Sequence, residues 1–182
     1  AILDVWFGGS EAGYSIPDVL FGDVNPSGKL TTTFPQNVGQ IPIYYNHKNT
    51  GRPLPEGKWF QKFRSNYLDV SNDPLYPFGY GLSYTTFEYG KLKVSSDKLK
   101  GAQTLTASIE VKNTGKVDGK EIVQLYIRDM VGTVTRPVKE LKGFQKVMIK
   151  AGETKTIEFK ITPEDLKFYN SELKFDWESG DF

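Results

Sequence analysis

The sequence predicts a mixed fold in which an antiparallel β-sandwich over residues 83–182 follows a shorter region of helix and strand signals. Three observations favour this fold class. Apolar and polar side chains alternate in several short segments, glycine-containing breaks separate those segments, and the alternation is absent upstream. This spacing is typical of a sandwich of roughly seven strands and about 100 residues, in the style of immunoglobulin or fibronectin type III domains.

The alternation is clearest in three segments of the predicted sandwich. One begins at Leu105, the second is EIVQLYIRD and the third is TIEFKIT, and the breaks are NTG from 113, VGT from 131 and KAGE from 150. Neighbouring side chains of a strand point to opposite faces, so the apolar set of each segment is expected to face the core. The inward positions predicted in this way are Leu105, Ala107, Ile109, Val111, Val123, Leu125, Ile127, Ile157, Phe159 and Ile161.

Residues 1–48 contain the main helix signal. In GSEAGYSIPDVLFGD, Ser15 is predicted to be the N-cap, with Pro17 in the first turn, Asp18 completing a capping box and Gly22 ending the helix. The apolar positions that would then share one face are Ile16, Val19 and Leu20.

Two further local signals complete the element list. The segment KLTTTF, which follows the NPSG turn at 25–28, suits a strand because it is rich in β-branched residues. In TPEDLKF, Thr162 is expected to cap a single helical turn.

Residues 49–82 are predicted to be a connector between these regions. They are rich in glycine, proline, asparagine and aromatic residues, and show neither helical nor sustained strand periodicity. The connector leads into PLYPFGYGLSYTTF at 74–87, an uncharged stretch with five aromatic rings. We expect these rings to dock against neighbouring parts of the protein, because a solvated linker would not carry so many of them.

Composition and charge exclude several function classes. The 182 residues are 38% hydrophobic and 25% charged, which allows a packed core. The net charge is +1 without a basic stripe, which argues against nucleic acid as a partner. No apolar run approaches a membrane span and no signal peptide is visible, so no membrane partner is predicted. Cysteine is absent and His47 is the single histidine, so neither a metal site nor a cofactor is predicted.

Catalytic signatures are incomplete throughout. GLSYT at 81–85 begins like the nucleophile elbow of serine hydrolases but lacks the closing glycine. GYGLSY fails the dinucleotide fingerprint at its last position, and GGSEAG lacks the Gly-Lys-Ser/Thr ending of a phosphate loop. Glu11 lies between glycines at a predicted helix start, where the helix dipole would keep the carboxylate ionised, so a structural role is favoured over a general acid. His47, in a turn-like NHKN stretch, is expected to be a turn or interface residue.

Taken together, the segments resemble the C-terminal part of family 3 glycoside hydrolases, specifically the bacterial β-glucosidases. The stretches that carry the resemblance occur in family order over essentially the whole chain. They are GSEAG with DVLFGDVNPSGKL, VGQIPIYYNHKNTGRP, PLYPFGYGLSYTTFEY, VKNTGKVDGKEIVQLYIRD and TRPVKELKGFQKVMIKAGET.

The resemblance implies a domain organisation. Residues 1–48 would be the C-terminal segment of an α/β sandwich domain, 49–82 the aromatic connector, and 83–182 a fibronectin type III-like domain with an incomplete last strand. Both ends of the chain look cut, and upstream barrel and sandwich domains are the expected partners. PLYPFGYGLSYTTF would then fix the geometry between domains.

The resemblance also implies a function for the parent enzyme. It would be a retaining β-glucosidase that removes terminal β-D-glucosyl residues from oligosaccharides or glucosides, with an Asp nucleophile and a Glu acid/base. Neither the motif of the nucleophile nor that of the acid/base occurs in this sequence. No catalytic residue is therefore named, and the chain alone is predicted to be inactive. No substrate-binding residue is assigned. The implied location is periplasmic or secreted, and a homodimer is possible in this family.

Two alternatives remain open from the sequence. One is a stand-alone module that binds carbohydrate or protein through aromatic residues such as Trp59, Tyr67 and Tyr76. The other is a purely structural or dimerising module. The helix and strand signals at 1–48 count against the binding module, which would not need them.

Overall fold

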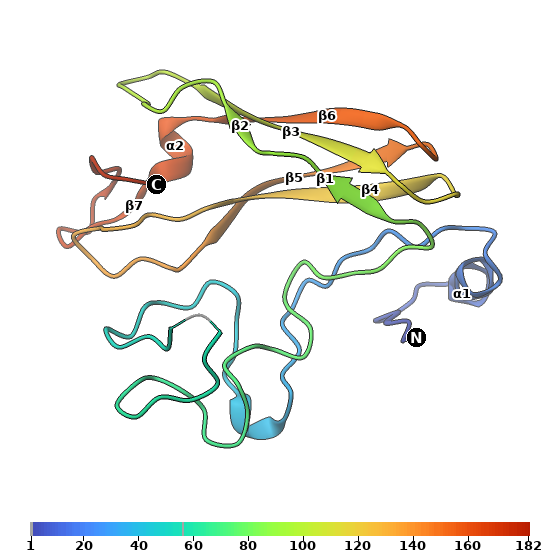
Figure 1. Ribbon diagram of the computed structural model, residues 1–182, viewed down its shortest axis with the longest axis horizontal. Helices are drawn as coiled ribbons and strands as arrows, with labels where there is room; N and C mark the ends of the chain where they lie inside the picture. Colours follow the sequence, from blue (N-terminus) through green and yellow to red (C-terminus); the bar gives the residue numbers. More distant parts are fainter. Residues whose placement is uncertain (1, 56) are drawn as a thin grey trace.

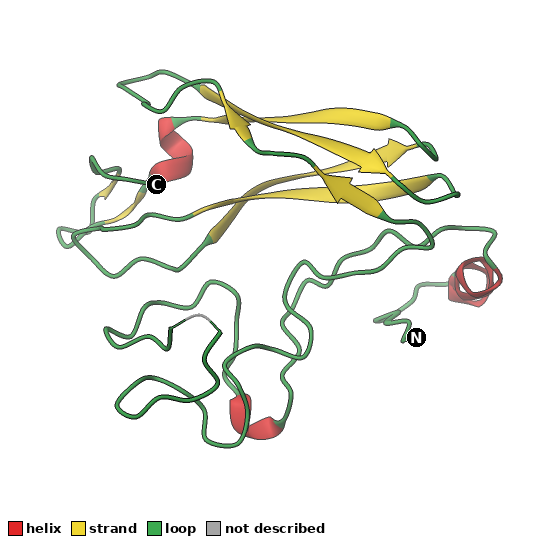
Figure 2. Cartoon of the chain, in the orientation of Figure 1, coloured by secondary structure: helices red, strands yellow, loops and turns green. Residues whose placement is uncertain are grey.

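The computed structural model describes residues 2–55 and 57–182, so Ala1 and Glu56 lie outside the described residues. Figure 1 shows two layers of strands, with a lobe of irregular chain beneath the lower layer and the first helix to one side. Loops and turns form most of the lobe, as the colouring of Figure 2 shows. The fold is mostly β, with few helices, and its centre is a β-sandwich.

The upper layer is built on β3 (Leu105–Asn113). Strand β6 (Thr154–Ile161) pairs with it antiparallel along one edge, from Leu105 opposite Ile161 to Lys112 opposite Thr154. On its other edge β3 pairs with two short strands, β1 (Phe87–Tyr89) and β2 (Lys93–Val94).

The lower layer consists of β4 (Gly119–Ile127) and β5 (Glu140–Ile149), paired antiparallel with an irregularity between Leu125 and Tyr126. A hairpin of β7 (Phe168–Tyr169) and β8 (Phe175–Asp176) follows the sandwich. The two layers meet in a small core, whose buried members are Val111, Val123, Ile149 and Ile157, with Phe87, Ile109, Val147 and Phe159 packed against them.

The predicted alternation of the strands is confirmed. Ala107 and Val111 are buried on β3, whereas Glu110 and Lys112 on the opposite face are exposed. The predicted breaks that begin at 131 and 150 lie in loops or turns between strands, and the one that begins at 113 starts on the last residue of β3. Because two packed layers require one apolar face per strand, the period-two pattern was sufficient to locate these elements.

The first helix, α1, spans Ala12–Phe21 and differs from the prediction at its start. Ser15 lies inside the helix and donates its hydroxyl to the carbonyl of Glu11 at 3.0 Å, so its predicted role as N-cap was wrong. The chain turns into the helix earlier, where the amide of Ala12 donates to the Gly9 carbonyl. Pro17 is accommodated inside the helix, at the cost of one backbone donor. Gly22 ends the helix in the left-handed conformation (φ 91°), as predicted.

The second helix is the single turn predicted from TPEDLKF. α2 spans Pro163–Leu166, and Thr162 precedes it with an extended backbone. The backbone amide of Thr162 donates to the Asp165 carboxylate at 2.7 Å, which closes a capping box.

The segment KLTTTF is extended but forms no regular strand, so that prediction was wrong. It runs antiparallel to the connector, with amides of Leu30 and Phe34 donating to the carbonyls of Tyr80 and Tyr76. Its partner contains prolines at 74 and 77, which have no backbone donor and interrupt the ladder. These two segments lie side by side below the sandwich in Figure 1.

The connector is held by a buried polar side chain. Gln40, the last residue of the 3-10 turn η1 (Val38–Gln40), has no exposed surface. Its amide nitrogen donates to the carbonyls of Ser71 and Asp73, and its oxygen accepts the amide of Gln36. These bonds give the irregular chain a fixed shape, since a buried amide is satisfied only in one arrangement. Within residues 2–55 and 57–182, no helix is long and apolar enough to cross a membrane.

Candidate functional site

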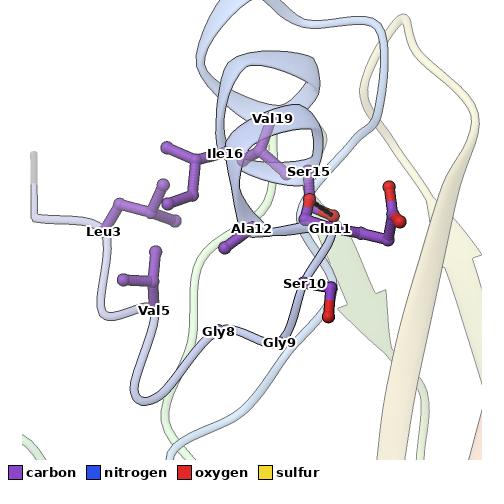
Figure 3. Close-up of a pocket in the computed structure, with 10 residues that line it drawn as sticks. All are labelled: Leu3, Val5, Gly8, Gly9, Ser10, Glu11, Ala12, Ser15, Ile16 and Val19. Carbon is purple, nitrogen blue, oxygen red and sulfur yellow. Dashed lines mark hydrogen bonds between the residues drawn. The ribbon is translucent and has the colours of Figure 1, made fainter.

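A cavity of about 380 Å³ lies between the N-terminal segment and α1. Figure 3 shows Leu3 and Val5 facing Ile16 and Val19 across it, while the carboxylate of Glu11 points away from these apolar side chains. The remaining lining is backbone or small side chains of Gly8, Gly9, Ser10, Ala12 and Ser15. The cavity is therefore an apolar space with a single carboxylate at its margin.

Glu11 is the N-cap of α1 and is exposed, and its side chain makes no capping hydrogen bond. Its backbone carbonyl accepts the amides of Tyr14 and Ser15, both at 3.0 Å. A retaining glycosidase requires two carboxyl groups about 5–5.5 Å apart, and the lining of this cavity supplies one. The residues that line this cavity therefore cannot hydrolyse a glycoside by that mechanism. The position of Glu11 at the start of α1 favours the structural role predicted for it.

The remaining catalytic fragments are also used structurally. The hydroxyl of Ser83, the serine of GLSYT, donates to the amide oxygen of Asn25 at 2.8 Å. His47 is exposed, and its backbone carbonyl accepts the amide of Val138 at 2.9 Å. Ser83 and His47 thus form hydrogen bonds with two different parts of the chain and do not contact each other as a catalytic pair would. Among the described residues, no group of three or more histidine, cysteine, aspartate or glutamate side chains could hold a metal ion.

The aromatic residues proposed as a sugar platform are divided by the structure. Trp59 is 59% exposed and lies beside Phe60, with ring centroids 6.3 Å apart. Tyr67 donates its hydroxyl to the Pro42 carbonyl at 3.0 Å, and Tyr76 stacks on Tyr80 at 5.4 Å. Only Trp59 of the three presents a largely open ring, so the structure does not assemble them into one platform.

Other connector aromatics are docked, as expected. Phe78 stacks on Tyr45 with ring centroids 4.3 Å apart, and Tyr45 meets Tyr126 of β4 edge-on at 5.8 Å. Burial raises the pKa of the Tyr126 hydroxyl, with a smaller contribution from Tyr45. Phe63, in contrast, is 74% exposed within this chain.

The loop before β5 contains a polar cluster that the sequence analysis did not single out. The Arg136 guanidinium lies 4.1 Å from the centre of the Phe168 ring, 3.4 Å from Asp129 and 2.8 Å from Glu140. These contacts place two carboxylates and an aromatic ring around a mostly buried cation and connect the loop to the hairpin β7–β8, while the buried Nε of Arg136 has no hydrogen-bond partner among the described residues. A small cavity of about 80 Å³ beside it includes Asn49 from the connector. The signal in the sequence was the single arginine of TRPVKEL.

Comparison with known families agrees with this arrangement. Residues 1–84 match the glycosyl hydrolase family 3 C-terminal domain, and residues 121–182 match the fibronectin type III-like domain. The two matches lie in the order in which the irregular lobe and the sandwich occur along the chain. The fold and these matches define the class, and the chain belongs to the family 3 glycoside hydrolases, of which it carries the C-terminal part.

Particular relatives share the whole length of this chain. It is 53% identical over 182 residues to a periplasmic beta-glucosidase of Salmonella typhimurium, covering 100% of this chain and 24% of the relative. It is 44% identical to a beta-xylosidase of Formosa agariphila, with the same coverage of 100% and 24%. The crystal structure of a beta-glucosidase from Listeria innocua in complex with glucose superposes with a TM-score of 0.88 at 46% identity, covering 96% of this chain and 24% of that one. The chain thus spans about a quarter of the length of the relatives it matches.

Proposed function

We propose that residues 1–182 are the non-catalytic C-terminal part of a retaining β-glucosidase, which removes terminal β-D-glucosyl residues from glucosides or oligosaccharides. The observation that carries this proposal is the 53% identity to a periplasmic beta-glucosidase over every residue of the chain. The cavity beside Glu11 has one carboxylate where a retaining glycosidase needs two, which supports a nucleophile and an acid/base elsewhere in the parent enzyme.

The proposal includes a division of labour along the chain. Residues 1–48 would complete an α/β sandwich domain, 49–82 would act as a docked connector, and 83–182 would form the fibronectin type III-like domain. The exposed apolar side chains of the N-terminal segment, such as Ile2 at 82% and Phe7 at 103%, support contact with upstream domains.

A β-xyloside is the second candidate substrate, because the beta-xylosidase relative is 44% identical over the same residues. Glucose and xylose differ by one hydroxymethyl group, and discrimination between them would come from the upstream domains. We also propose a periplasmic or secreted location and a homodimer, which cell fractionation and light scattering of the complete protein would test.

The deciding experiment uses the complete protein that contains this chain. Turnover of an aryl β-D-glucoside and of the matching β-D-xyloside is compared by kcat/KM, and NMR identifies the anomer that is formed first. We expect preference for the glucoside and a β-anomer as the first product. Preference for the xyloside would select the second candidate. Hydrolysis of neither, together with binding of either sugar, would leave the stand-alone binding module as the function.

A further inference from the structure

Strand β4 carries an acidic residue on its buried face. Glu121 shares that face with the core residue Val123, and its side chain is 8% exposed. In EIVQLYI the alternation would place an apolar residue at this position. Burying a carboxylate costs much free energy unless it is paired with a cation and hydrogen-bonded, so we expect Glu121 to have such partners.

The partners of Glu121 come from distant parts of the chain. The Lys29 ammonium lies 3.1 Å from one carboxylate oxygen, and the Tyr89 hydroxyl of β1 donates to the other at 2.8 Å. Lys29 is 15% exposed and also donates to the Gly81 carbonyl at 2.9 Å. The buried charge therefore joins four segments: the chain after α1, the connector, β1 and β4.

A second set of bonds joins α1 and the chain after it to residues 83–84 and to the turn before β4. The Asn25 amide nitrogen donates to the Asp118 carbonyl at 3.0 Å, and its oxygen accepts the Ser83 hydroxyl and the Tyr84 amide. The Tyr84 hydroxyl donates to the carbonyl of Val19 in α1 at 2.6 Å. Helix α1 is thus connected to the edge of the sandwich through side chains of the segment that follows it and of the segment that precedes β1.

The backbones at this junction approach too closely for a side chain on Gly81. A Cβ atom built there would lie 2.4 Å from the Gly28 carbonyl oxygen, next to Lys29. Such contacts do not occur between real atoms, so the position of Gly28 and Lys29 requires glycine at 81. The close approach brings the Lys29 ammonium within reach of both the Gly81 carbonyl and Glu121.

We propose that Lys29, Glu121 and Tyr89 form an orientation latch, which fixes the α1-bearing segment in one position on the fibronectin type III-like sandwich. Buried ion pairs often contribute little net stability, because the cost of removing two charges from water offsets their attraction. They do require one geometry, whereas apolar surfaces tolerate small shifts. The latch therefore acts mainly on orientation, and the inference does not depend on which glycoside is hydrolysed.

Amide hydrogen exchange of the complete protein tests the latch. In the double variant Lys29→Met/Glu121→Leu both charges are replaced by apolar groups of similar size. We expect the melting temperature to stay close to that of the wild type, while the amides of Leu30, Gly79 and Tyr84 exchange at least tenfold faster and the amide of Val111 is unchanged. The matched control is Lys93→Met/Glu110→Leu, an exposed pair at 71% and 58%, which should change neither quantity.

Two results would overturn the proposal. One is wild-type exchange at Leu30, Gly79 and Tyr84 in a folded double variant, and the other is faster exchange spread evenly over the sandwich, which would assign the pair to global stability. If the double variant does not fold, Tyr89→Phe and Gly81→Ala decide in its place. Each should accelerate exchange at the same junction amides alone, and wild-type exchange in both would reject the latch.

Discussion

The hydroxyl of Thr85 donates a 2.6 Å hydrogen bond to the side-chain oxygen of Asn113, which has no exposed surface. The Asn113 amide nitrogen donates to the carbonyls of Val117 and Ile149 at 2.8 and 3.0 Å. One side chain thus joins the segment just before β1, the β3–β4 turn and the end of β5. It connects the lobe to the sandwich at the place where β1 begins.

Replacement of Asn113 by alanine should therefore lower the free energy of unfolding by about 3 kcal/mol, because several buried groups lose their partners together. Urea denaturation of the complete protein measures the change. The control is Asn49→Ala, an exposed asparagine, for which we expect a change within about 0.5 kcal/mol. Equal effects of the two variants would show that Asn113 is not a junction residue.

The connector aromatics should differ in their contribution to stability according to their packing. Phe78 stacks on Tyr45 at 4.3 Å and is half-buried, so Phe78→Ala should cost about 2 kcal/mol, below the value for a fully buried ring. Phe63→Ala, at a ring that is 74% exposed, should cost little. Thermal unfolding of both variants is the measurement. If Phe78→Ala leaves stability unchanged but weakens sugar binding, the ring belongs to a ligand platform instead.

Tyr89 should make the protein sensitive to alkaline pH. Burial raises the pKa of its hydroxyl well above the ordinary value, and the hydrogen bond and charge of Glu121 raise it further. Above the ordinary pKa of about 10 the unfolded chain has lost a proton that the folded chain retains. The Tyr89 contribution to stability is therefore complete below pH 10 and is lost as the pH rises toward the folded-state pKa.

The variant Tyr89→Phe removes this titration. Its free energy of unfolding should fall less steeply between about pH 10 and 11.5 than that of the wild type, as measured by urea denaturation. Tyr169→Phe, at an exposed position of the β7–β8 hairpin, serves as the control and should retain the wild-type slope. Parallel slopes for Tyr89→Phe and the wild type would contradict the hydrogen bond to Glu121.

The exposed apolar side chains around α1 should promote association when the chain is produced alone. Phe7 is 103% exposed and Phe21 85%, and large apolar surface drives self-association and binding of hydrophobic dyes. Size-exclusion chromatography with dye fluorescence measures both. The variant Phe7→Lys/Phe21→Lys should bind clearly less dye than the wild type, whereas a compact wild-type monomer without dye binding would mean that this surface needs no partner.

Sequence patterns predicted the elements that depend on short-range rules. The period-two alternation located β3, β4 and β6, and the Thr162 cap and the Gly22 end of α1 were correct. The start of α1 was wrong because a serine before a proline satisfies the local capping rule, while the preceding glycine turn begins the helix earlier. The sequence thus contains two possible helix starts, and the local pattern does not distinguish between them.

The junction could not be predicted in the same way. The contact between Lys29 and Glu121 joins segments far apart in the sequence, and its only local signal is an acid at an inward position of EIVQLYI. Composition likewise cannot separate Phe78, which is stacked, from Phe63, which is exposed. Both distinctions depend on which segments meet in space.

We propose that this chain supports a β-glucosidase without supplying its carboxylates. The most direct measurement is turnover of an aryl β-D-glucoside by the purified 182-residue chain, beside the complete protein and its Glu11→Gln variant. We expect no turnover by the chain alone and wild-type kcat for Glu11→Gln in the complete protein. Turnover by the chain alone, or loss of turnover in the Glu11→Gln variant of the complete protein, would contradict this proposal, and the second result would make Glu11 a catalytic residue.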